Sequence, residues 1–290
     1  FLLLGAGIWV AISLIGVGVI ALGAFTSTPP GLTLANQTWG SMASWTLTAL
    51  PLFIWMGEIL FRTRLAEELF EGLAHWLGGL PGQLLHVNVV GSGIFAAFTG
   101  SSSATCATIG KITLPELGQR GYPRRMLIGS LAGSATLGLL IPPSIIMIVY
   151  AVAAEVSIAR LFIAGILPGL ILMLLFSGYV ALWALFNGTA MPQEKTSLPL
   201  LERLKAGRFM FPVVLLILLV IGSIYGGLAT ATEAAALGVA GALILSWLSG
   251  SLNWRSFSEG LMGAMLTSTM IMFIVAGAAF LTAAMGFTGI

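Results

Sequence analysis

The chain has 290 residues, of which 58% are hydrophobic and only 8% are charged, and its mean hydropathy is +1.05. A soluble domain carries about 25% charged residues, so this composition excludes a soluble protein, and the net charge of +2 indicates little about partners. Backbone that faces lipid must close its own hydrogen bonds within helices, and the long apolar runs therefore predict an all-α polytopic membrane protein.

The apolar runs predict the elements in chain order. A first span at 1–25 is followed by an uncharged loop at 26–40 and a second span at about 41–61. Residues 62–82 are amphipathic, with leucines at helical spacing, and predict a helix that lies at the membrane interface. The later predicted elements are an interrupted apolar stretch at 84–117, another at 126–154, a span at 161–186, a polar linker at 187–208, and spans at 209–225, 232–249 and 260–285.

Lysine and arginine predict the orientation of these elements. Ten of the twelve lie in four polar segments, which the positive-inside rule places in the cytoplasm: 62–82, 118–125, 187–208 and 250–259. Of the other two, Arg160 falls on the opposite side and Lys111 lies within a membrane segment.

The segment 84–117 then begins and ends on the cytoplasmic side. Each of its arms has only about 15 residues, too few to span a bilayer, and TGSSSAT (99–105) interrupts it in the middle. We therefore expect a re-entrant hairpin with the serines at its tip. The alternative is a pair of full helices in which the serines are small packing residues.

The segment 126–154 is interrupted by a second break. Pro142 and Pro143 remove two backbone donors and leave carbonyls near Gly138 without their helical partners. We expect a broken helix whose two halves meet at membrane depth, where such breaks are buried or line a cavity. An ordinary proline kink is the alternative.

Two parts of the chain resemble each other in their pattern of small residues, with opposite orientation in the membrane. Residues 7–24 resemble 227–244, and the segments that follow them, 34–58 and 256–280, are also alike. This pattern predicts an inverted repeat. The expected division is a first repeat at 1–186, a cytoplasmic linker at 187–208 and an incomplete second repeat at 209–290. Because the chain begins on Phe1 inside an apolar run, and a second hairpin would follow Ile290, we expect a fragment.

The chemistry of the hairpin tip favours a monovalent cation. Gly100 permits the turn, and Ser102 or Ser103 can cap the returning arm. The carbonyl end of the outgoing arm attracts a cation, and the amide end of the returning arm attracts an anion. A neutral cage of oxygens suits Na⁺ better than Ca²⁺ or Zn²⁺. Proton coupling requires a titratable residue near the break, and the nearest along the chain are Lys111 and Glu116.

Other polar residues have simpler interpretations. Glu58 either pairs with a basic residue or faces a cavity, and Glu233 reads as a helix-start acid with Thr230 or Thr232 as the cap. His75 and His86 lack metal-binding spacing and are expected to be structural, as is the single cysteine, Cys106. All ten acidic residues are glutamate, which excludes aspartate-based sites, and catalytic or nucleotide-binding motifs are absent from the sequence.

Four segments are similar to one transporter family. They are GSGIFAAFTGSSSATCATIGKITLPEL (91–117), RGYPRRM (120–126), GLLIPPSIIMIVYA (138–151) and YGGLATATEAAALG (225–238). They resemble the large membrane subunit of tripartite ATP-independent periplasmic (TRAP) transporters, and the resemblance covers essentially the whole chain.

The resemblance implies an elevator-type secondary transporter of the bacterial or archaeal inner membrane, similar in fold to divalent anion–sodium symporters. It implies import of organic acids driven by Na⁺, with no other cofactor and no nucleic acid. It also implies two partners, a small four-helix membrane subunit and a periplasmic substrate-binding protein. Carried over by position, the ion and substrate site comprises Gly100, Ser101, Ser102, Ser103 and Thr105 at the tip, and Gly138, Ile141, Pro142, Pro143 and Ser144 at the break. Na⁺ itself is expected at Ser101, Ser102, Ser103 and Gly138.

Two other classes stay open on the sequence alone. One is a membrane-embedded hydrolase that uses a serine of 101–103, although no base stands at a recognisable spacing. The other is a scaffold subunit that does not transport. The identity of the organic acid is not encoded in any motif of this chain.

Overall fold

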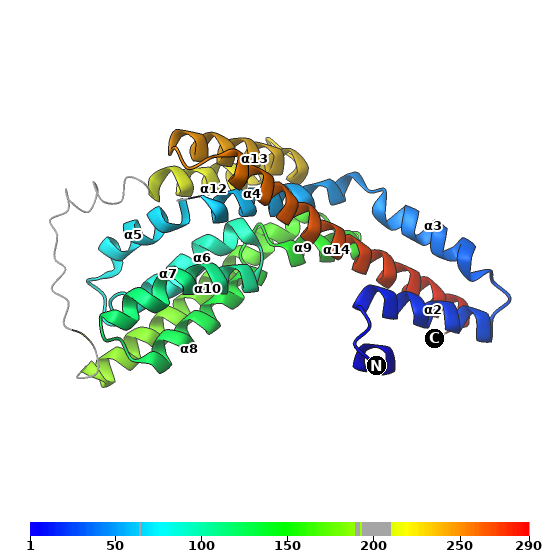
Figure 1. The fold of residues 1–290 in the computed structure, drawn as a ribbon, viewed down its shortest axis with the longest axis horizontal. Helices are drawn as coiled ribbons and strands as arrows, with labels where there is room; N and C mark the ends of the chain where they lie inside the picture. Colours follow the sequence, from blue (N-terminus) through cyan, green and yellow to red (C-terminus); the bar gives the residue numbers. More distant parts are fainter. Residues whose placement is uncertain (64, 189–191, 193–209, 290) are drawn as a thin grey trace.

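The computed structural model describes the chain except for residues 64, 189–191, 193–209 and 290, and its described part consists of helices and their connections (Figure 1). The longer helices are α2 (Val10–Phe25), α3 (Pro30–Met42), α4 (Ala49–Arg62), α5 (Leu65–Leu77), α6 (Leu85–Thr99), α7 (Ser102–Gln119), α8 (Arg124–Ala135), α9 (Ile145–Ala153), α10 (Ile158–Phe186), α12 (Met210–Tyr225), α13 (Ala231–Leu248) and α14 (Trp254–Thr288). Short turns of helix are α1 (Leu2–Gly5), η1 (Trp45–Thr48) and η2 (Thr136–Leu139). The prediction of an all-α protein is confirmed.

Several of these helices suit a membrane. Among the described residues, α10, α13 and α14 are each long and apolar enough to cross a bilayer. The pair formed by α3 and η1–α4 meets the same criterion together, although it bends by 60° between its two parts. The shorter helices α2 and α12 are also apolar. The chain therefore has the helices of a multi-pass membrane protein.

The structure corrects two predictions near the N-terminus. The predicted loop at 26–40 was wrong, because Pro30–Met42 forms helix α3. Proline is tolerated in the first helical turn, uncharged polar residues do not oppose a helix, and α14 packs along one side of α3. The predicted single span at 1–25 is divided into α1 and α2, with Gly7 in a left-handed conformation between them.

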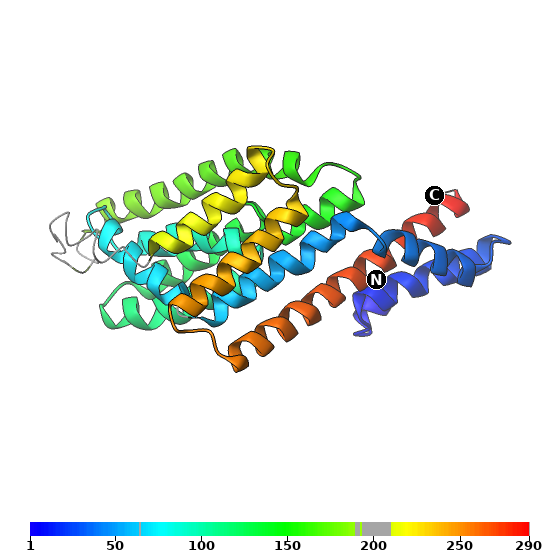
Figure 2. The ribbon, with the colours of Figure 1, turned by 90° about the horizontal axis from the view of Figure 1, so that it is seen from above.

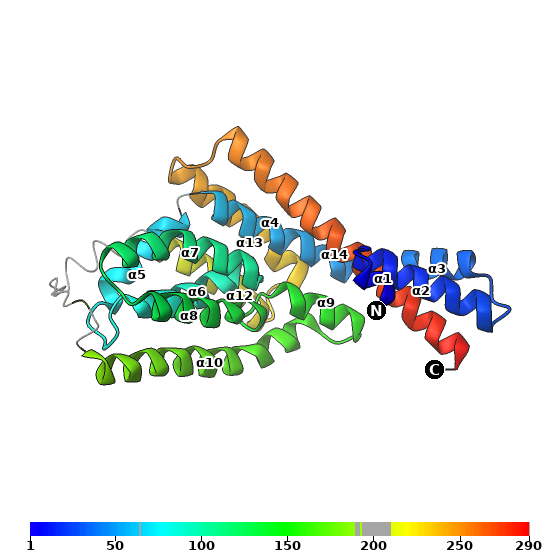
Figure 3. The same ribbon diagram turned by 60° about the horizontal axis from the view of Figure 1, so that its bottom comes forward.

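The helices form a bundle and an arm. The bundle contains α4 to α13, and the arm consists of α1, α2 and α3, with both chain termini at its side of the molecule (Figures 1 and 2). Helix α14 runs from the bundle into the arm, packing on α4 with its first half and on α2 and α3 with its second. Within the bundle, α10 runs along the length of one face (Figure 3). The main core lies in the bundle, around α4, α6, α12 and α13.

Three of the four positively charged segments lie at the same end of the bundle. Arg62 and Thr63 line one cavity together with residues 250–259, and residues of α5 line another with Glu116 and Arg120. The fourth segment, 187–208, falls mostly outside the described residues. We refer to this end of the bundle as the basic end. The membrane side that it faces, and the division into two repeats, stay predictions.

Candidate functional site

Helices α6 and α7 form a tight antiparallel hairpin. At its open end the N–H of Leu84 donates to the hydroxyl of Tyr122 at 3.3 Å. At its closed end the hydroxyls of Thr99 and Thr105 lie 2.9 Å apart. Gly100 makes the turn with a φ of 55°, a left-handed conformation that favours glycine, and its N–H donates to the carbonyl of Ala96 in the last turn of α6. The hairpin and its turn therefore lie where the sequence predicted them.

The serines at the tip have three different roles. Ser101 is the N-cap of α7, and its hydroxyl accepts a hydrogen bond from the N–H of Ala104 at 3.4 Å. The prediction that Ser102 or Ser103 is the cap was wrong by one or two residues, because the chain is already extended at Ser101 directly after the turn. The hydroxyl of Ser103 lies 3.1 Å from that of Ser101. The Oγ of Ser102 is buried and has no hydrogen-bond partner among the described residues.

The broken helix is also present. Helix α8 continues through η2 to Leu139, and α9 starts only at Ile145. In the break, the carbonyl of Leu137 accepts two N–H groups, and the hydroxyl of Ser144 donates to the carbonyl of Leu139 at 2.9 Å. The peptide bond between the two prolines of the break is cis. Side chain and backbone thus hold an irregular loop in one conformation.

The tip and the break touch through their backbones. The carbonyl of Gly100 accepts the N–H of Ile145 at 3.3 Å. A Cβ atom added to Gly100 would lie 2.6 Å from that same nitrogen, and one added to Gly138 would lie 2.8 Å from the carbonyl carbon of Ser101. Both glycines are therefore required for this close approach. The two breaks, separated by about forty residues in sequence, form one structure.

A cavity of about 790 Å³ opens beside this contact. The hairpin tip and the start of α9 form one wall, and α4 and α14 form the other. We refer to it as the tip cavity. The predicted residues that line it are Gly100, Ser101, Ser102 and Ser103.

The remaining predicted residues lie behind this wall. Gly138, Pro142, Pro143 and Ser144 are buried in the break, and Thr105 is fully buried against Thr99. The side chain of Ile141 points away from the cavity and packs near Gly169 of α10. The structure thus groups the predicted residues into a lining and a support for it.

Sequence reasoning missed Glu58 as a neighbour of the tip. Lys111 and Glu116 are the ionisable residues nearest to the tip along the chain, whereas α4 brings Glu58 into the lining of the tip cavity. Both interpretations of Glu58 hold, because its carboxylate also accepts a hydrogen bond from Arg62 at 2.8 Å. Glu58 is an ionisable residue within an apolar span, and such residues usually face a cavity or the interior of a bundle.

Arg62 links this carboxylate to a second one. Its guanidinium also donates to Glu259 on α14 at 3.2 Å, and Glu259 in turn accepts from Arg255 at 2.8 Å. These pairs are partly exposed and contribute little to stability individually. Their position matters more, since they join α4 to α14 directly beside the tip cavity.

The other singled-out residues have structural roles. Thr230 and Glu233 form a capping box at the start of α13, as predicted. His86 is buried, with one ring nitrogen 2.7 Å from the carbonyl of Pro81 and the other 3.2 Å from the hydroxyl of Ser177. Cys106 packs against the core.

The comparison with known families agrees with this architecture. Over residues 1–290 the chain matches the family described as "Tripartite ATP-independent periplasmic transporter, DctM component". The chain belongs to this family. The resemblance noted on the hairpin and break motifs is thereby confirmed.

Curated relatives carry different substrate names. The chain is 34% identical over 247 residues to the C4-dicarboxylate TRAP transporter large permease protein of Pseudomonas aeruginosa, covering 84% of this chain and 57% of the relative. It is 33% identical over 259 residues to the ectoine/5-hydroxyectoine large permease of Ruegeria pomeroyi, covering 86% and 58%. It is 31% identical over 267 residues to the isethionate permease DctMQ of Oleidesulfovibrio alaskensis, covering 90% and 41%.

These matches also limit what the chain represents. It spans about half the length of the curated relatives it matches.

The relatives are named as permease proteins of transporters, which are not enzymes. Among the described residues lining the tip cavity, Glu58 is the only ionisable one, and it is bound to Arg62. The hydrolase alternative therefore has no support in the cavity or in the relatives.

Proposed function

We propose that this chain is the permease part of a secondary transporter that imports organic acids together with Na⁺. The observation that carries the proposal is the contact between the hairpin tip and the broken helix at the wall of a cavity. Irregular backbone at membrane depth is tolerated only where it is buried or lines a cavity, and transporters use such breaks to hold ions and substrates.

Na⁺ is the coupling ion that the chemistry of the tip favours. The proposed ligands are oxygens of Ser101, Ser102, Ser103 and Gly138. The buried Oγ of Ser102 has no partner among the described residues, and an orphaned buried oxygen in a native protein calls for an explanation such as a bound ion. The carboxylate in the tip cavity is engaged by Arg62. The oxygens at the tip itself are hydroxyl and carbonyl oxygens, which are neutral. A neutral oxygen cage suits a monovalent hard cation.

The proposed cargo and partners follow from the family. We propose an organic acid as substrate, in line with the C4-dicarboxylate and isethionate names of the relatives. We also propose a small four-helix membrane subunit and a periplasmic substrate-binding protein as partners, in the inner membrane.

Uptake into proteoliposomes tests the function. The complete transporter, reconstituted with its binding protein loaded with a labelled organic acid, should accumulate that acid when an inward Na⁺ gradient is imposed. Replacing external Na⁺ with K⁺ should reduce the initial rate to background, and a proton gradient alone should not restore it. Equal uptake in K⁺ would refute Na⁺ coupling, and indifference to changes at the hairpin tip would favour the scaffold alternative.

The packing of the helices supports the proposed inverted repeat. Suppose that α2 corresponds to α13 and that α4 corresponds to α14. A two-fold axis that relates these helices then turns the contact between α2 and α14 into the contact between α13 and α4. The same axis maps the contact between α4 and α14 onto itself. All three contacts are extensive in the structure. We propose that this axis lies in the membrane plane and that the hairpin is re-entrant.

Cysteine labelling tests the re-entrant hairpin. In a background with Cys106→Ala, we expect Gly79→Cys and Gly118→Cys to react with an impermeant maleimide from the same, cytoplasmic side. Both glycines are exposed and have no neighbouring atom within 4 Å of an added Cβ. Val156→Cys, which lies beyond α9 and is exposed, serves as the comparison and should react only from the opposite side. Labelling of positions 79 and 118 from different sides contradicts a re-entrant hairpin.

A further inference from the structure

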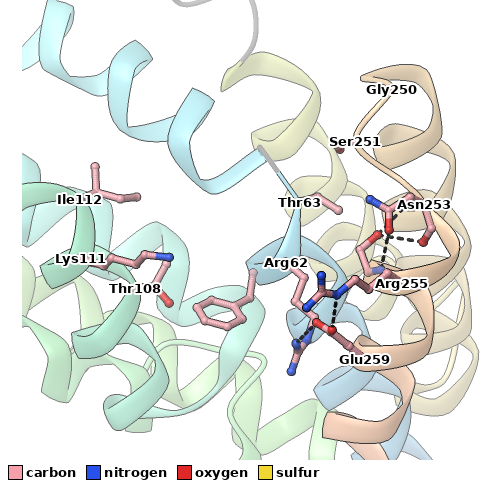
Figure 4. A pocket seen from close by; sticks show the side chains of 12 residues that line it. Arg62, Thr63, Thr108, Lys111, Ile112, Gly250, Ser251, Asn253, Arg255 and Glu259 are labelled. Atoms are coloured by element: carbon pink, nitrogen blue, oxygen red, sulfur yellow. Dashed lines mark hydrogen bonds and ion pairs between the residues drawn. The ribbon is translucent and has the colours of Figure 1, made fainter.

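A second cavity lies at the basic end of the bundle, between α4, α7 and the start of α14 (Figure 4). Its volume is about 650 Å³. Three basic side chains line it, those of Arg62, Lys111 and Arg255, against the single carboxylate of Glu259. We refer to it as the basic cavity. Its excess of positive charge suits an anion.

Of the three basic residues that line this cavity, Lys111 is the one that no group in the described part of the chain engages. Arg62 and Arg255 both bind Glu259, and Arg62 also binds Glu58. Lys111 has no hydrogen bond or ion pair with any of the described residues, is exposed, and extends into the cavity from α7 (Figure 4). It is also the lysine of the predicted membrane hairpin, 84–117. An ionisable residue in such a segment marks a functional position by default.

The basic cavity continues the tip cavity. Phe61 lines both of them. On α7, Ala107 lines the tip cavity and Thr108 lines the basic cavity, so the boundary falls between adjacent residues. Helix α14 also lines both cavities, the basic cavity with Glu259 and the tip cavity with Thr267. Lys111 lies ~12 Å along α7 from Ser103, at 1.5 Å per residue. The two cavities are therefore successive parts of one groove between α4, α7 and α14.

We propose that Lys111 binds the carboxylate of the transported organic acid at an exit site in the basic cavity. The proposal rests on the proposed function and adds a place where the substrate is held after it leaves the hairpin tip. The ammonium of Lys111 supplies a charge-assisted hydrogen bond to the carboxylate. Arg62 and Arg255 are balanced by Glu58 and Glu259, so the net positive charge that draws the anion toward the basic end is that of Lys111.

Binding of succinate, a dicarboxylate, tests the site directly. The complete transporter in nanodiscs is titrated with succinate or with succinamide, its neutral diamide, and thermal stabilisation is recorded. Succinate should stabilise the wild type and succinamide should not. Lys111→Gln should raise the half-saturating succinate concentration about tenfold, because one charge-assisted contact is lost. Lys111→Arg should restore most of the affinity. Arg160→Gln, which changes an exposed cation far from the basic end, should leave it unchanged.

The outcomes separate this site from the proposed function. Without succinate, Lys111→Gln should unfold at the wild-type temperature, because the lysine has no hydrogen bond or ion pair among the described residues. Unchanged succinate affinity in Lys111→Gln, equal stabilisation by succinamide, or no stabilisation of the wild type overturns the exit site. Na⁺-driven uptake by the wild type is measured in parallel. If succinate binds through Lys111 but uptake does not follow Na⁺, the proposed function fails and the site stands.

Discussion

Replacing Gly138 with alanine should reduce coupled uptake by about a hundredfold, the loss that a misplacement on the order of 1 Å causes in a positioned site. The added Cβ would lie within 3.0 Å of three backbone atoms of Ser101 and Ser102. Backbone atoms cannot rotate away as a side chain can, so the tip of the hairpin must move away from the break. The oxygens that we propose as Na⁺ ligands come from both sides of this contact and would separate.

The measurement is the initial rate of uptake against external Na⁺, at matched amounts of transporter in the proteoliposomes. Gly129→Ala is the matched control, since Gly129 lies on the same broken helix and an added Cβ meets no atom within 4 Å. Alanine there should stabilise α8 by up to ~1 kcal/mol and leave uptake unchanged. Uptake by Gly138→Ala with the wild-type rate and Na⁺ half-saturation would show that the contact is not needed for coupling.

Local sequence signals were enough to predict the two breaks. Gly100 and the two prolines act on the backbone within one turn, through the left-handed conformation of the glycine and the missing donors of the prolines. The hairpin and the broken helix therefore follow from the sequence with errors of one or two residues. The N-cap at Ser101 shows the size of such an error, because neighbouring serines have the same capping chemistry.

Signals that depend on tertiary packing were harder to interpret. Residues 26–40 are polar and uncharged, and nothing local distinguishes a surface loop from a helix that α14 covers. Glu58 was recognised as unusual, but its place beside the hairpin tip depends on how α4 packs against α6 and α14. Lys111 was noted as an exception to the charge pattern. Its position in the basic cavity became visible only when α4 and α14 were placed opposite α7.

Replacing Ser102 with alanine should weaken Na⁺ binding by about tenfold, since the loss of one ligand of ~1.4 kcal/mol is one decade in affinity. The same change should not destabilise the protein in the absence of Na⁺. The Oγ of Ser102 is buried and has no partner among the described residues. A buried polar atom without a partner costs about 1–3 kcal/mol, so its removal should raise the unfolding temperature slightly when no ion is bound.

Two opposite effects on stability then follow from one substitution. A ligand that binds only the folded state stabilises it in proportion to the logarithm of its concentration over its dissociation constant. In K⁺, the unfolding temperature of purified Ser102→Ala transporter should therefore equal or exceed that of the wild type. At a Na⁺ concentration that saturates the wild type, it should be lower than that of the wild type. The half-saturating Na⁺ concentration for uptake should rise in parallel.

Ser246→Ala is the matched control, because the Oγ of Ser246 in α13 is also buried without a partner among the described residues and lies outside the tip cavity. Its removal should bring the same slight stabilisation in K⁺ and no change in the response to Na⁺. If Ser102→Ala and Ser246→Ala respond to Na⁺ identically, the Oγ of Ser102 is not a ligand. A rise in Na⁺ half-saturation confined to Ser102→Ala would identify the hairpin tip as the coupling site, because, of these two serines, Ser102 is the one next to a break that can supply further ligands.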